Sequence, residues 1–583
     1  MSAFLAVNKI SFRIGGPAGF GIMNTGLMFS KACSRVGLHV FDYVEYPSLI
    51  RGGHNTYQVR AEDTPVRSQV ETIDVLIALD EPTLTIHADE LKEDSLIVYD
   101  DATIHPEHTT LKKGIRCPVP LKALVAEAGG PEIMQNTVAL AAVLGILDYD
   151  FSVFETIIQD SFEGKKGGIV DQNILVARKG YDYAKEHYSH HSHYQLKAVK
   201  APKRMVLTGN EALALGAVQA GLKFYAAYPM TPASTILHTL AAWQERHGIV
   251  VKHAEDEISV INMGIGAGYA GVRSMVATSG GGFALMNEGV SLAAMTESPV
   301  VIVEVMRGGP ATGLPTWTEQ SDLRFIMGAG HGDFPRFVLA PGDVEEAFWM
   351  TAEAFNIAEQ YQSPVIIVSD KYLAESHRTA EPFDLSKVRI ERGKLLRQAP
   401  KNYLRYADSP DGISPRTIPG VPGGFFLANS DEHDDWGYSN EEISIRDRMM
   451  QKRMRKEATY AKTMPQPVLV GATDADVTIV GWGSTKGPIL DAMDWLAKDG
   501  YKVNFLQITH ISPFPEETVK RLLTGAKRTL MVENNYTAQM AGLIREKTGI
   551  EIKERLLKYD GRPFYPEEIY GRVKMMAGAG GER

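Results

Sequence analysis

The chain has 583 residues, of which 44% are apolar, and 61 basic residues against 71 acidic residues leave a formal net charge of −10. The length predicts about three to four domains with ordinary globular cores. The acidic balance argues against a broad nucleic-acid surface, and the sequence contains no apolar run of about 18 residues that could span a membrane.

Two cysteines, Cys33 and Cys117, make up the thiol content. Two thiols cannot build a disulfide framework, and they fall short of the four that usually hold an iron–sulfur cluster. The sequence begins with MSAFLAVNKISFRIGG, which lacks the long apolar core of a signal peptide. We therefore expect a soluble, cytoplasmic, multidomain protein that carries no cluster of its own.

Residues 1–195 alternate strand-like and helix-like patterns, which indicates α/β layers. The continuous apolar run at 73–80 is typical of a buried parallel strand. The unit closes on a polar stretch that we interpret as a solvated linker rather than a metal site. Four histidines lie in that stretch: His187, His190, His191 and His193.

A glycine-rich loop at 15–21 lies between a strand pattern and a helix pattern, where backbone N–H groups can bind phosphate. Asp42 follows about 20 residues later, as a ribose-binding acid would. Asn24, however, stands where the dinucleotide fingerprint requires a glycine, so a tight turn or another phosphorylated ligand fits the loop better. A second polar loop carries Arg51 and His54, where binding residues often lie.

Residues 200–380 form a second α/β unit, in which polar residues follow several strand patterns. Tyr228 and Thr231 follow one strand, and we predict Thr231 at the N-cap and Pro232 at the first position of the next helix. Ligands of α/β sheets bind at the carboxyl ends of strands, and an N-cap hydroxyl beside free N–H groups suits a carboxylate. The alternative, that Thr231 only caps its helix, stays open.

Three carboxylates, Glu255, Asp256 and Glu257, lie at the next strand-to-helix junction. They could simply favour the positive end of the helix dipole. The following helix, from Ile258 to Ala270, is almost entirely apolar and glycine, so we expect it to be buried. A carboxylate that leads into such a helix is partly desolvated, which is the state that a proton-sharing glutamate needs.

Two glycine-rich segments complete this unit. Residues 278–283 are predicted to be a flexible strand-to-helix turn. Arg307 follows a buried strand and begins a loop that contains Thr312. A guanidinium at a strand end can bind an anionic group of a ligand.

Residues 381–465 have the composition of a connecting segment. They contain an acidic patch at 431–435 and a basic helical run at 445–456. We interpret the basic run as a charged face that pairs with the acidic patch, in preference to a phosphate site. Residues 466–583 return to alternating strand and helix patterns and form the third α/β unit.

Together these motifs resemble those of the 2-oxoacid:ferredoxin oxidoreductases, specifically the alpha subunit. The second unit is similar to the family's pyrimidine-binding thiamine diphosphate domain in YPMTP, HAEDE, TSGGGFALM and RGGPATGLPT. The first unit resembles the gamma-type domain, here fused in front, and the third resembles the transketolase C-terminal-like domain in GWGSTKGP and ENNYTAQMAG. The segments RGGPATGLPT and GFFLANSDEHDDWGYS are more similar to the 2-oxoglutarate branch than to the pyruvate branch.

The resemblance implies a thiamine-diphosphate-dependent enzyme that converts 2-oxoglutarate and coenzyme A to succinyl-CoA and CO₂ and reduces ferredoxin. It implies that Glu257 hydrogen-bonds N1′ of the cofactor's aminopyrimidine, with Glu255 as the fallback. It also implies that Thr231 and Arg307 bind the substrate carboxylate. Tyr228 and Thr312 complete the substrate-binding set that we expect.

The chain departs from the family pattern in two ways. Gly281 stands where a proline is usual, and no G-D-G motif followed at the family's spacing by an asparagine occurs. The diphosphate arm, Mg²⁺ and a [4Fe-4S] cluster are therefore expected on a beta subunit. We expect two alpha–beta pairs in the assembly.

Three alternatives stay open. The same chemistry could act on pyruvate or on a branched or aromatic 2-oxoacid. The loop at 15–21 could serve a nucleotide-dependent dehydrogenase, which its poor fingerprint argues against. The chain could also be a non-catalytic assembly subunit, but the carboxylates before a buried helix, with Thr231 and Arg307 at other strand ends, argue against that.

Overall fold

A computed structural model describes residues 5–49, 52–165 and 167–578. The described residues divide into two compact units, and the finer division predicted above stays a prediction. No helix in these ranges has the length and apolar character that crossing a membrane requires. The first unit comprises Met1–Leu207, Ser376–Pro382 and Tyr565–Glu568, and the second comprises Thr208–Glu375, Phe383–Phe564 and Ile569–Arg583.

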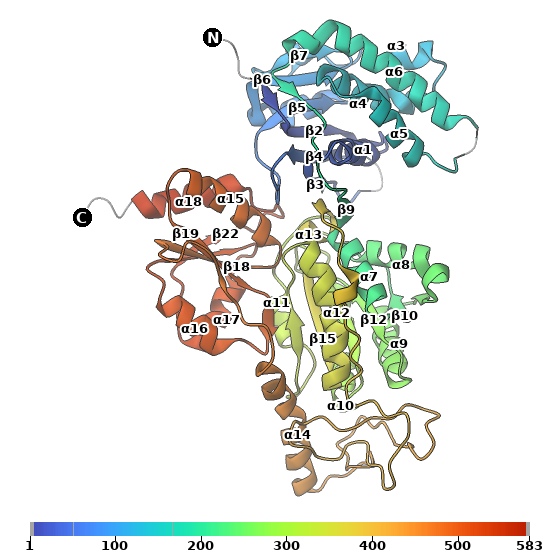
Figure 1. The fold of residues 1–583 in the computed structure, drawn as a ribbon, viewed down its shortest axis with the longest axis vertical. Coiled ribbons are helices and arrows are strands. Elements are labelled where there is room, and N and C mark those ends of the chain that lie inside the picture. The colour runs from blue at the N-terminus through green and yellow to red at the C-terminus, as the bar shows by residue number, and fades with distance from the viewer. Residues whose placement is uncertain (1–4, 50–51, 166, 579–583) are drawn as a thin grey trace. The chain divides into compact units, whose positions relative to one another are not determined.

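The first unit is built on a mixed sheet of eight strands (Figure 1). All six residues of β5 are buried, and β5 runs parallel to both of its neighbours, as the apolar run at 73–80 predicts. A short pair of strands, β1 (Ala6–Val7) and β8 (Tyr194–Gln195), lies outside this sheet. In sheet order the strands are β7 (Ile115–Pro118), β6 (Leu91–Tyr99), β5 (Ile73–Ala78), β2 (Lys9–Pro17), β4 (His54–Glu62), β3 (His39–Glu45), β16 (His377–Ala380) and β9 (Met205–Thr208).

Helices of the first unit bury an apolar core against its sheet. Every residue of α4 is buried, because α4 packs between the sheet and α6. The histidine stretch predicted to be a linker is partly helical, since α6 continues to Tyr188. The helices are α1 (Ile22–Arg35), α2 (Glu81–Ile86), α3 (Leu121–Glu127), α4 (Gln135–Ile146), α5 (Phe151–Ser161) and α6 (Ile169–Tyr188).

Asp42 has a structural role in the first unit. Its buried carboxylate accepts hydrogen bonds from Ser30 Oγ (2.8 Å), Tyr57 OH (2.6 Å) and the backbone N–H of His377 (2.7 Å). The last of these bonds attaches β16 to the sheet beside β3. These bonds occupy both carboxylate oxygens, so the suggestion that Asp42 binds a ribose is wrong.

The second unit contains a sheet of seven strands, which is parallel except for β20. Helices α9 and α10 pack on one face and share an apolar core with β12 and β13. The strands in order are β11 (Val250–His253), β10 (Phe224–Ala227), β12 (Ser274–Thr278), β13 (Val300–Met306), β15 (Pro364–Asp370), β14 (Phe337–Leu339) and β20 (His510–Ser512). The helices are α7 (Gly209–Gln219), α8 (Ser234–His247), α9 (Glu257–Tyr269), α10 (Gly280–Met295), α11 (Leu323–Met327), α12 (Val344–Tyr361) and α13 (Lys371–Glu375).

A second, five-stranded sheet of this unit is formed by the C-terminal part of the chain. Its strands alternate with helices, as the sequence pattern predicts. In sheet order the strands are β17 (Leu469–Gly471), β19 (Val503–Ile508), β18 (Val477–Trp482), β21 (Thr529–Glu533) and β22 (Glu554–Leu557). The helices are α15 (Lys486–Lys498), α16 (Glu516–Thr524), α17 (Gln539–Thr548) and α18 (Pro566–Gly578).

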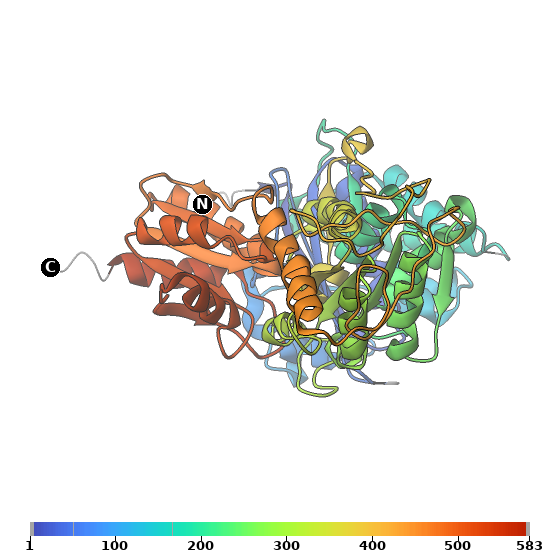
Figure 2. The same ribbon diagram turned by 90° about the horizontal axis from the view of Figure 1, so that it is seen from below.

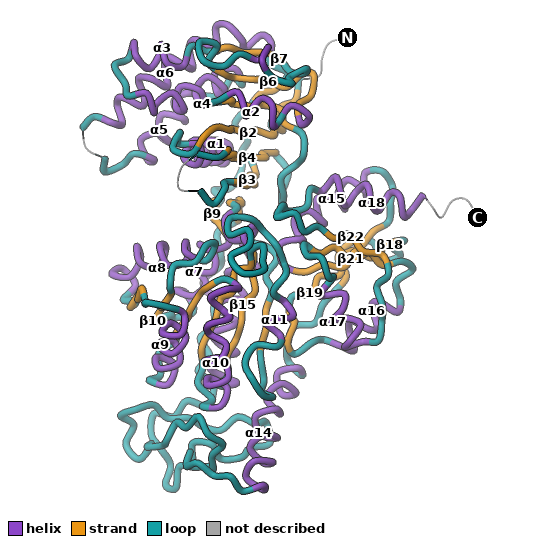
Figure 3. Tube along the Cα trace, turned by 180° about the vertical axis from the view of Figure 1, so that it is seen from behind, coloured by secondary structure: helices purple, strands orange, loops and turns teal. Residues whose placement is uncertain are grey.

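The connecting segment consists mainly of loops followed by α14 (Ile443–Ala461), as Figure 3 shows. Figure 2 shows α14 and these loops from below, nearest the viewer. Glu432 accepts hydrogen bonds from Arg446 and Arg453, and Asp435 accepts two from Arg448 at 2.8 Å each. The interpretation of the basic run as a face that pairs with the acidic patch is therefore confirmed.

A cluster of buried charged side chains also attaches α14 to the residues that follow α10. Glu297, which follows α10, lies 2.5 Å from Lys452 Nζ and 2.7 Å from Lys456 Nζ, and all three side chains are almost fully buried. Burial raises the pKa of Glu297, but the charges of Lys452, Lys456 and Arg405 outweigh it and hold that pKa well below its usual range. One carboxylate cannot balance three cations, and burial lowers the pKa of Lys456 to about 7.

We expect Glu297→Gln to destabilise the second unit by about 3–5 kcal/mol, because it leaves two ammonium groups buried beside a neutral amide. Since the folded-state pKa of Glu297 is depressed, its contribution is present above the unfolded pKa and is lost as the pH falls through the folded one. Urea denaturation of the variant at neutral pH measures this loss. Glu441→Gln, at an exposed carboxylate of the same unit, is the control that should leave stability unchanged.

Candidate active site

The candidate site lies at the carboxyl ends of the parallel strands in the second unit. Tyr228 and Thr231 follow β10, Thr278 ends β12, Arg307 follows β13, and Glu257 begins α9 after β11. These strands are neighbours in the order β11-β10-β12-β13. The sheet therefore brings together residues that lie up to 79 positions apart in sequence, from Tyr228 to Arg307, at the edge where α/β proteins bind ligands.

Glu257 is the first residue of α9 and only 2% exposed. Its neighbour Asp256 caps the helix by accepting a hydrogen bond from the Ser259 backbone N–H at 2.8 Å. Within the described ranges Glu257 Oε1 makes no hydrogen bond of normal geometry, although the Thr278 hydroxyl lies nearby. Burial, with the charge of Asp256 adding to it, raises the pKa of Glu257 above its usual value. A buried, unsatisfied carboxyl oxygen of this kind can share a proton with a ring nitrogen.

The glycines after β12 make room for this carboxyl group. The predicted change from strand to helix is confirmed, since β12 ends at Thr278 and α10 begins at Gly280. The prediction of a flexible turn through residue 283 is wrong, because Gly280, Gly281 and Gly282 form the first turn of α10. A side chain at Gly282 would collide with both Thr278 Oγ1 and Glu257 Oε1. The absence of a Cβ lets the N-terminus of α10 approach Glu257 closely.

Glu255 and Asp256, the other two acidic residues of this junction, are not buried and unsatisfied as Glu257 is. Asp256 is occupied as the helix cap, and Glu255 is exposed. The prediction that the whole helix is buried is wrong, because Ile258 is 50% exposed and only one face of α9 packs on the sheet. Of the three carboxylates, Glu257 is the one on the packed face.

Arg307 is joined to Thr231 by a hydrogen bond from Arg307 Nη1 to the Thr231 carbonyl oxygen at 2.7 Å. The N-cap prediction for Thr231 is wrong, because α8 begins at Ser234 and its N-cap is Ala233. Thr231 instead lies in a turn closed by the Ala233 N–H and the Met230 carbonyl at 2.8 Å. The backbone of that turn, rather than the helix dipole, places Thr231 beside the guanidinium.

Thr278 connects the two parts of the site. Its hydroxyl lies beside Glu257 and also contacts Met230 Sδ at 3.9 Å, one residue before Thr231. Burial lowers the pKa of Arg307, and the negative charges of Asp322 and Glu304 oppose that effect. The site thus combines a buried carboxyl group with a half-buried cation.

Two predicted residues stay at the periphery. Tyr228 is 40% exposed, and its ring lies 6.2 Å from that of His253. Thr312 is exposed in a loop closed by the Leu314 N–H and the Gly308 carbonyl at 2.7 Å. The contacts that we describe join neither residue to Arg307 or Glu257.

Three further acidic residues of this region were not predicted from the sequence. Glu304, Glu319 and Asp322 come from β13 and from the segment before α11. Burial, together with the charge of Asp322, raises the pKa of Glu319 to about 7. The signal in the sequence is Glu304 itself, a charged residue in the otherwise apolar strand VVIVEVM.

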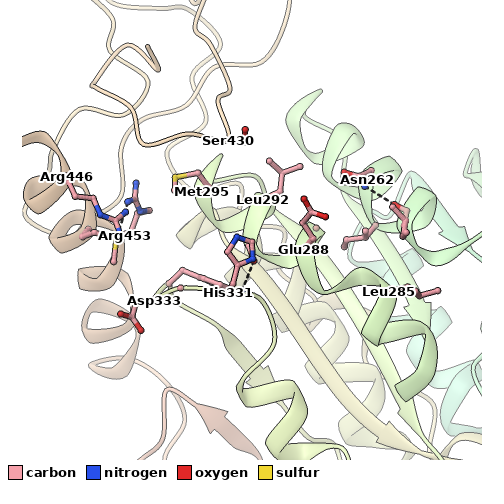
Figure 4. Close-up of a pocket in the computed structure, with 17 residues that line it drawn as sticks. Asn262, Leu285, Glu288, Leu292, Met295, His331, Asp333, Ser430, Arg446 and Arg453 are labelled. Atoms are coloured by element: carbon pink, nitrogen blue, oxygen red, sulfur yellow. Dashed lines mark hydrogen bonds between the residues drawn. The ribbon is translucent and has the colours of Figure 1, made fainter. Parts of the chain in front are cut away.

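A cavity of about 630 Å³ lies next to this site on the outer faces of α9 and α10. Figure 4 shows Arg446 and Arg453 on one side of it and Asn262 and Leu285 on the other. Ile258, the residue after Glu257, contributes to its lining, but no residue of the predicted site does. The cavity is therefore a neighbouring surface feature.

Arg51 and His54 are the two residues of the first unit that the sequence placed on a possible binding loop. Arg51 lies outside the described residues. His54 begins β4, and its Nε2 atom lies 3.1 Å from His87 Nε2. Burial and the neighbouring His87 lower the pKa of His54 to about 4. A ligand-binding role for this loop stays a prediction.

Three family models match the chain. Residues 215–452 match "Pyruvate flavodoxin/ferredoxin oxidoreductase, thiamine diP-bdg". Residues 11–183 match "Pyruvate ferredoxin/flavodoxin oxidoreductase", and residues 475–569 match "Pyruvate:ferredoxin oxidoreductase core domain II". The matches follow the order of the α/β segments along the chain.

Individual proteins are similar over 64% to 98% of the chain. The 2-oxoacid:ferredoxin oxidoreductase 2, subunit alpha, of Aeropyrum pernix is 36% identical, covering 98% of each chain. The 2-oxoglutarate synthase subunit KorA of Methanothermobacter thermautotrophicus is 34% identical over 64% of this chain and 98% of its own. The solved 2-oxoglutarate:ferredoxin oxidoreductase from Magnetococcus marinus, with 2-oxoglutarate, coenzyme A and succinyl-CoA bound, is 33% identical with a TM-score of 0.91, covering 97% of this chain and 99% of that one.

Proposed function

The chain belongs to the 2-oxoacid:ferredoxin oxidoreductase family as an alpha subunit with a fused gamma domain, and we propose that it acts on 2-oxoglutarate. In this proposal 2-oxoglutarate and coenzyme A give succinyl-CoA and CO₂, and ferredoxin takes up the electrons. Support comes from the 2-oxoglutarate enzymes among its relatives. The observation in the structure that carries the proposal is the half-buried Arg307 beside Thr231, next to the buried Glu257.

Glu257 is the proposed catalytic residue of this chain. The chain contains a thiamine-diphosphate-binding domain, and the unsatisfied Oε1 atom beside Gly282 fits the protonated edge of an aminopyrimidine ring. When bound, thiamine diphosphate supplies the nucleophilic carbon and the electron sink for decarboxylation. Glu257 holds and moves the proton at N1′ of the ring, which its desolvated position favours. Glu255 is exposed, so it stays the fallback.

Arg307 and Thr231 are proposed to bind the substrate carboxylate. A guanidinium offers five N–H donors, and the described contacts use one of them, to the Thr231 carbonyl. The donors that remain can bind a carboxylate in a fixed geometry. Tyr228 and Thr312, at the rim, are proposed to complete the substrate site.

A beta subunit is proposed to supply the rest of the active site. It would carry the diphosphate-binding domain with Mg²⁺ and a [4Fe-4S] cluster, in an assembly of two alpha–beta pairs. Cys33 and Cys117 are both buried, and burial raises their pKa values, which suits inert thiols rather than cluster ligands. No group of three or more metal-ligating side chains occurs among the residues that the structure describes.

We expect the chain expressed without its partner to be colourless and free of iron, because two buried thiols cannot hold a cluster. Visible absorption spectra and iron analysis of the purified chain measure this. The complex purified with its partner is the control and should be brown. Stoichiometric iron in the isolated chain would contradict the assignment of the cluster to the beta subunit.

The proposed function is tested with the co-purified complex, a panel of 2-oxoacids, coenzyme A and a low-potential dye. We expect coenzyme A-dependent dye reduction with 2-oxoglutarate as the best substrate. Pyruvate is the second candidate, because the matching family models are described by pyruvate. A preference for pyruvate, or for a branched or aromatic 2-oxoacid, would overturn the substrate while leaving the family unchanged.

A further inference from the structure

The five-stranded sheet of the second unit has an arrangement in which α/β proteins bind ligands. Its central strand β18 runs parallel to β19 on one side and to β21 on the other. The chain therefore leaves β18 toward one side for β19 and reaches β21 on the opposite side, so the strand order reverses between β18 and β21. The carboxyl ends of two such strands flank the crevice in which doubly wound sheets hold their ligands. The proposed function assigns no ligand to this crevice.

In this protein the crevice holds Gln320, a residue of the segment between Arg307 and α11. β18 ends at Trp482 and β21 ends at Glu533, which is followed by Asn534. The Gln320 side chain donates to the Trp482 carbonyl oxygen (2.9 Å) and accepts from the Asn534 N–H (3.0 Å). Its backbone N–H donates to the Asn534 carbonyl oxygen at 2.7 Å. Gln320 is 0% exposed, so the strand ends bind it as they would bind a small polar ligand.

A second contact attaches the same segment to the turn that follows β22. The Thr318 N–H donates to the Gly561 carbonyl oxygen at 3.1 Å. The next residue, Arg562, places its guanidinium 3.4 Å from the centroid of the Trp317 ring, and so forms a cation–π contact. A side chain at Gly561 would place its Cβ 3.0 Å from both Leu314 Cδ1 and Trp317 Cβ, so glycine allows the two segments to lie this close.

These contacts reach Arg307 through a short closed loop. The Leu314 N–H donates to the Gly308 carbonyl oxygen at 2.7 Å, and the Gly308 N–H donates to the Trp317 carbonyl oxygen at 3.2 Å. Both bonds are made by the residue directly after Arg307. A displacement of Trp317 therefore moves the backbone that carries the guanidinium, which itself donates to the Thr231 carbonyl oxygen.

We propose that the five-stranded sheet binds the segment 317–320 at its strand ends, and that Gln320, Trp317 and Arg562 are positioning residues for Arg307. Gln320 anchors the segment, and the contact between Arg562 and Trp317 holds the loop that starts at Arg307. The role of Arg307 in binding the substrate rests on the proposed function, but the attachment of the segment to the sheet does not.

Arg562→Ala is expected to raise KM for the 2-oxoacid about fivefold, within the range of a partly exposed cation–π contact. Without that contact, the loop samples positions in which the Arg307 guanidinium does not reach the carboxylate. kcat should change much less, because Glu257, the proposed proton-transfer residue, is part of α9. A general loss of folded protein would instead lower kcat of the preparation and leave KM unchanged.

The test uses the co-purified complex and removes the contact from either side. Trp317→Leu removes the ring and should give the same rise in KM, whereas Trp317→Phe keeps an aromatic face and should stay near wild type. Lys574→Ala is the matched control, since Lys574 lies 4.8 Å from the centroid of the Tyr570 ring in α18. It removes another cation–π contact of this part of the chain and should leave both KM and kcat unchanged.

Hydrogen exchange of the same complexes, measured by mass spectrometry, does not depend on turnover. Peptides that contain the N–H groups of Gly308, Leu314 and Thr318 should exchange about fivefold faster in Arg562→Ala and Trp317→Leu than in wild type, because the contact that holds this loop is lost. Peptides from β13 should exchange as in wild type. An unchanged exchange rate, or an unchanged KM in an active complex, would overturn the proposal. If exchange accelerates but the complex oxidises no 2-oxoacid, the attachment to the sheet stands and the proposed function fails.

Discussion

Glu257→Gln is expected to lower kcat of the assembled complex by about 10³-fold or more, within the range that general acid–base groups contribute. Glutamine keeps the size and can still hydrogen-bond, but it cannot take up or release a proton. Because Glu257 starts a helix whose cap is Asp256, the fold and the assembly should be preserved. Steady-state dye reduction and size-exclusion chromatography of the same preparation measure both quantities.

Glu255→Gln is the matched control for that experiment. It removes an exposed carboxylate two residues away, so kcat should stay near wild type. If Glu257→Gln keeps full activity and Glu255→Gln loses it, the fallback residue is the catalytic one. Full activity in both variants would remove the acid–base role from this junction altogether.

Arg307→Ala is expected to raise KM for the 2-oxoacid about 10- to 100-fold, because hydrogen bonds to charged groups contribute about 1.5–3 kcal/mol. The loss should be larger in KM than in kcat, since the guanidinium is proposed to bind the carboxylate and not to move a proton. Initial-rate kinetics of the complex with 2-oxoglutarate give both constants.

Two further arginine variants sharpen the result. Arg307→Lys keeps a point charge but loses the planar fork, so its KM should lie between those of wild type and Arg307→Ala. Arg545→Ala removes an exposed arginine of α17 whose side chain is 64% exposed, and it should change neither constant. An unchanged KM in Arg307→Ala would show that another group binds the carboxylate.

Local sequence patterns predicted much of the fold, because strands and helices follow from periodicity over a few residues. The buried strand at 73–80 and the alternation of strands and helices after residue 200 are examples that the structure confirms. The helix starts were less predictable. Thr231 and Pro232 have the residue types of a helix start, yet the Met230–Ala233 turn delays α8 until Ser234. Tertiary contacts at the strand end decided this difference.

Glycine patterns were misinterpreted for a related reason. Gly280–Gly282 suggested a flexible turn, because glycine has a low helix propensity. In the structure the same residues form a helical turn, since only a residue without a Cβ lets α10 approach Thr278 and Glu257. This close approach joins α10 to α9 and β12, which are separate in sequence, so a local sequence pattern cannot predict it.

By itself, the sequence determined the α/β class and the family through its ordered motifs. Its two cysteines and the missing diphosphate motif led to the prediction of a partner subunit, which stays a prediction. The tertiary structure decided which acids are desolvated. Glu255 and Glu257 are two residues apart, yet one is exposed and the other 2% exposed, and Glu304 is desolvated because the whole of β13 is buried in the sheet. Protonation depends on burial and on charges brought together from distant parts of the chain, and these are properties of the packed fold.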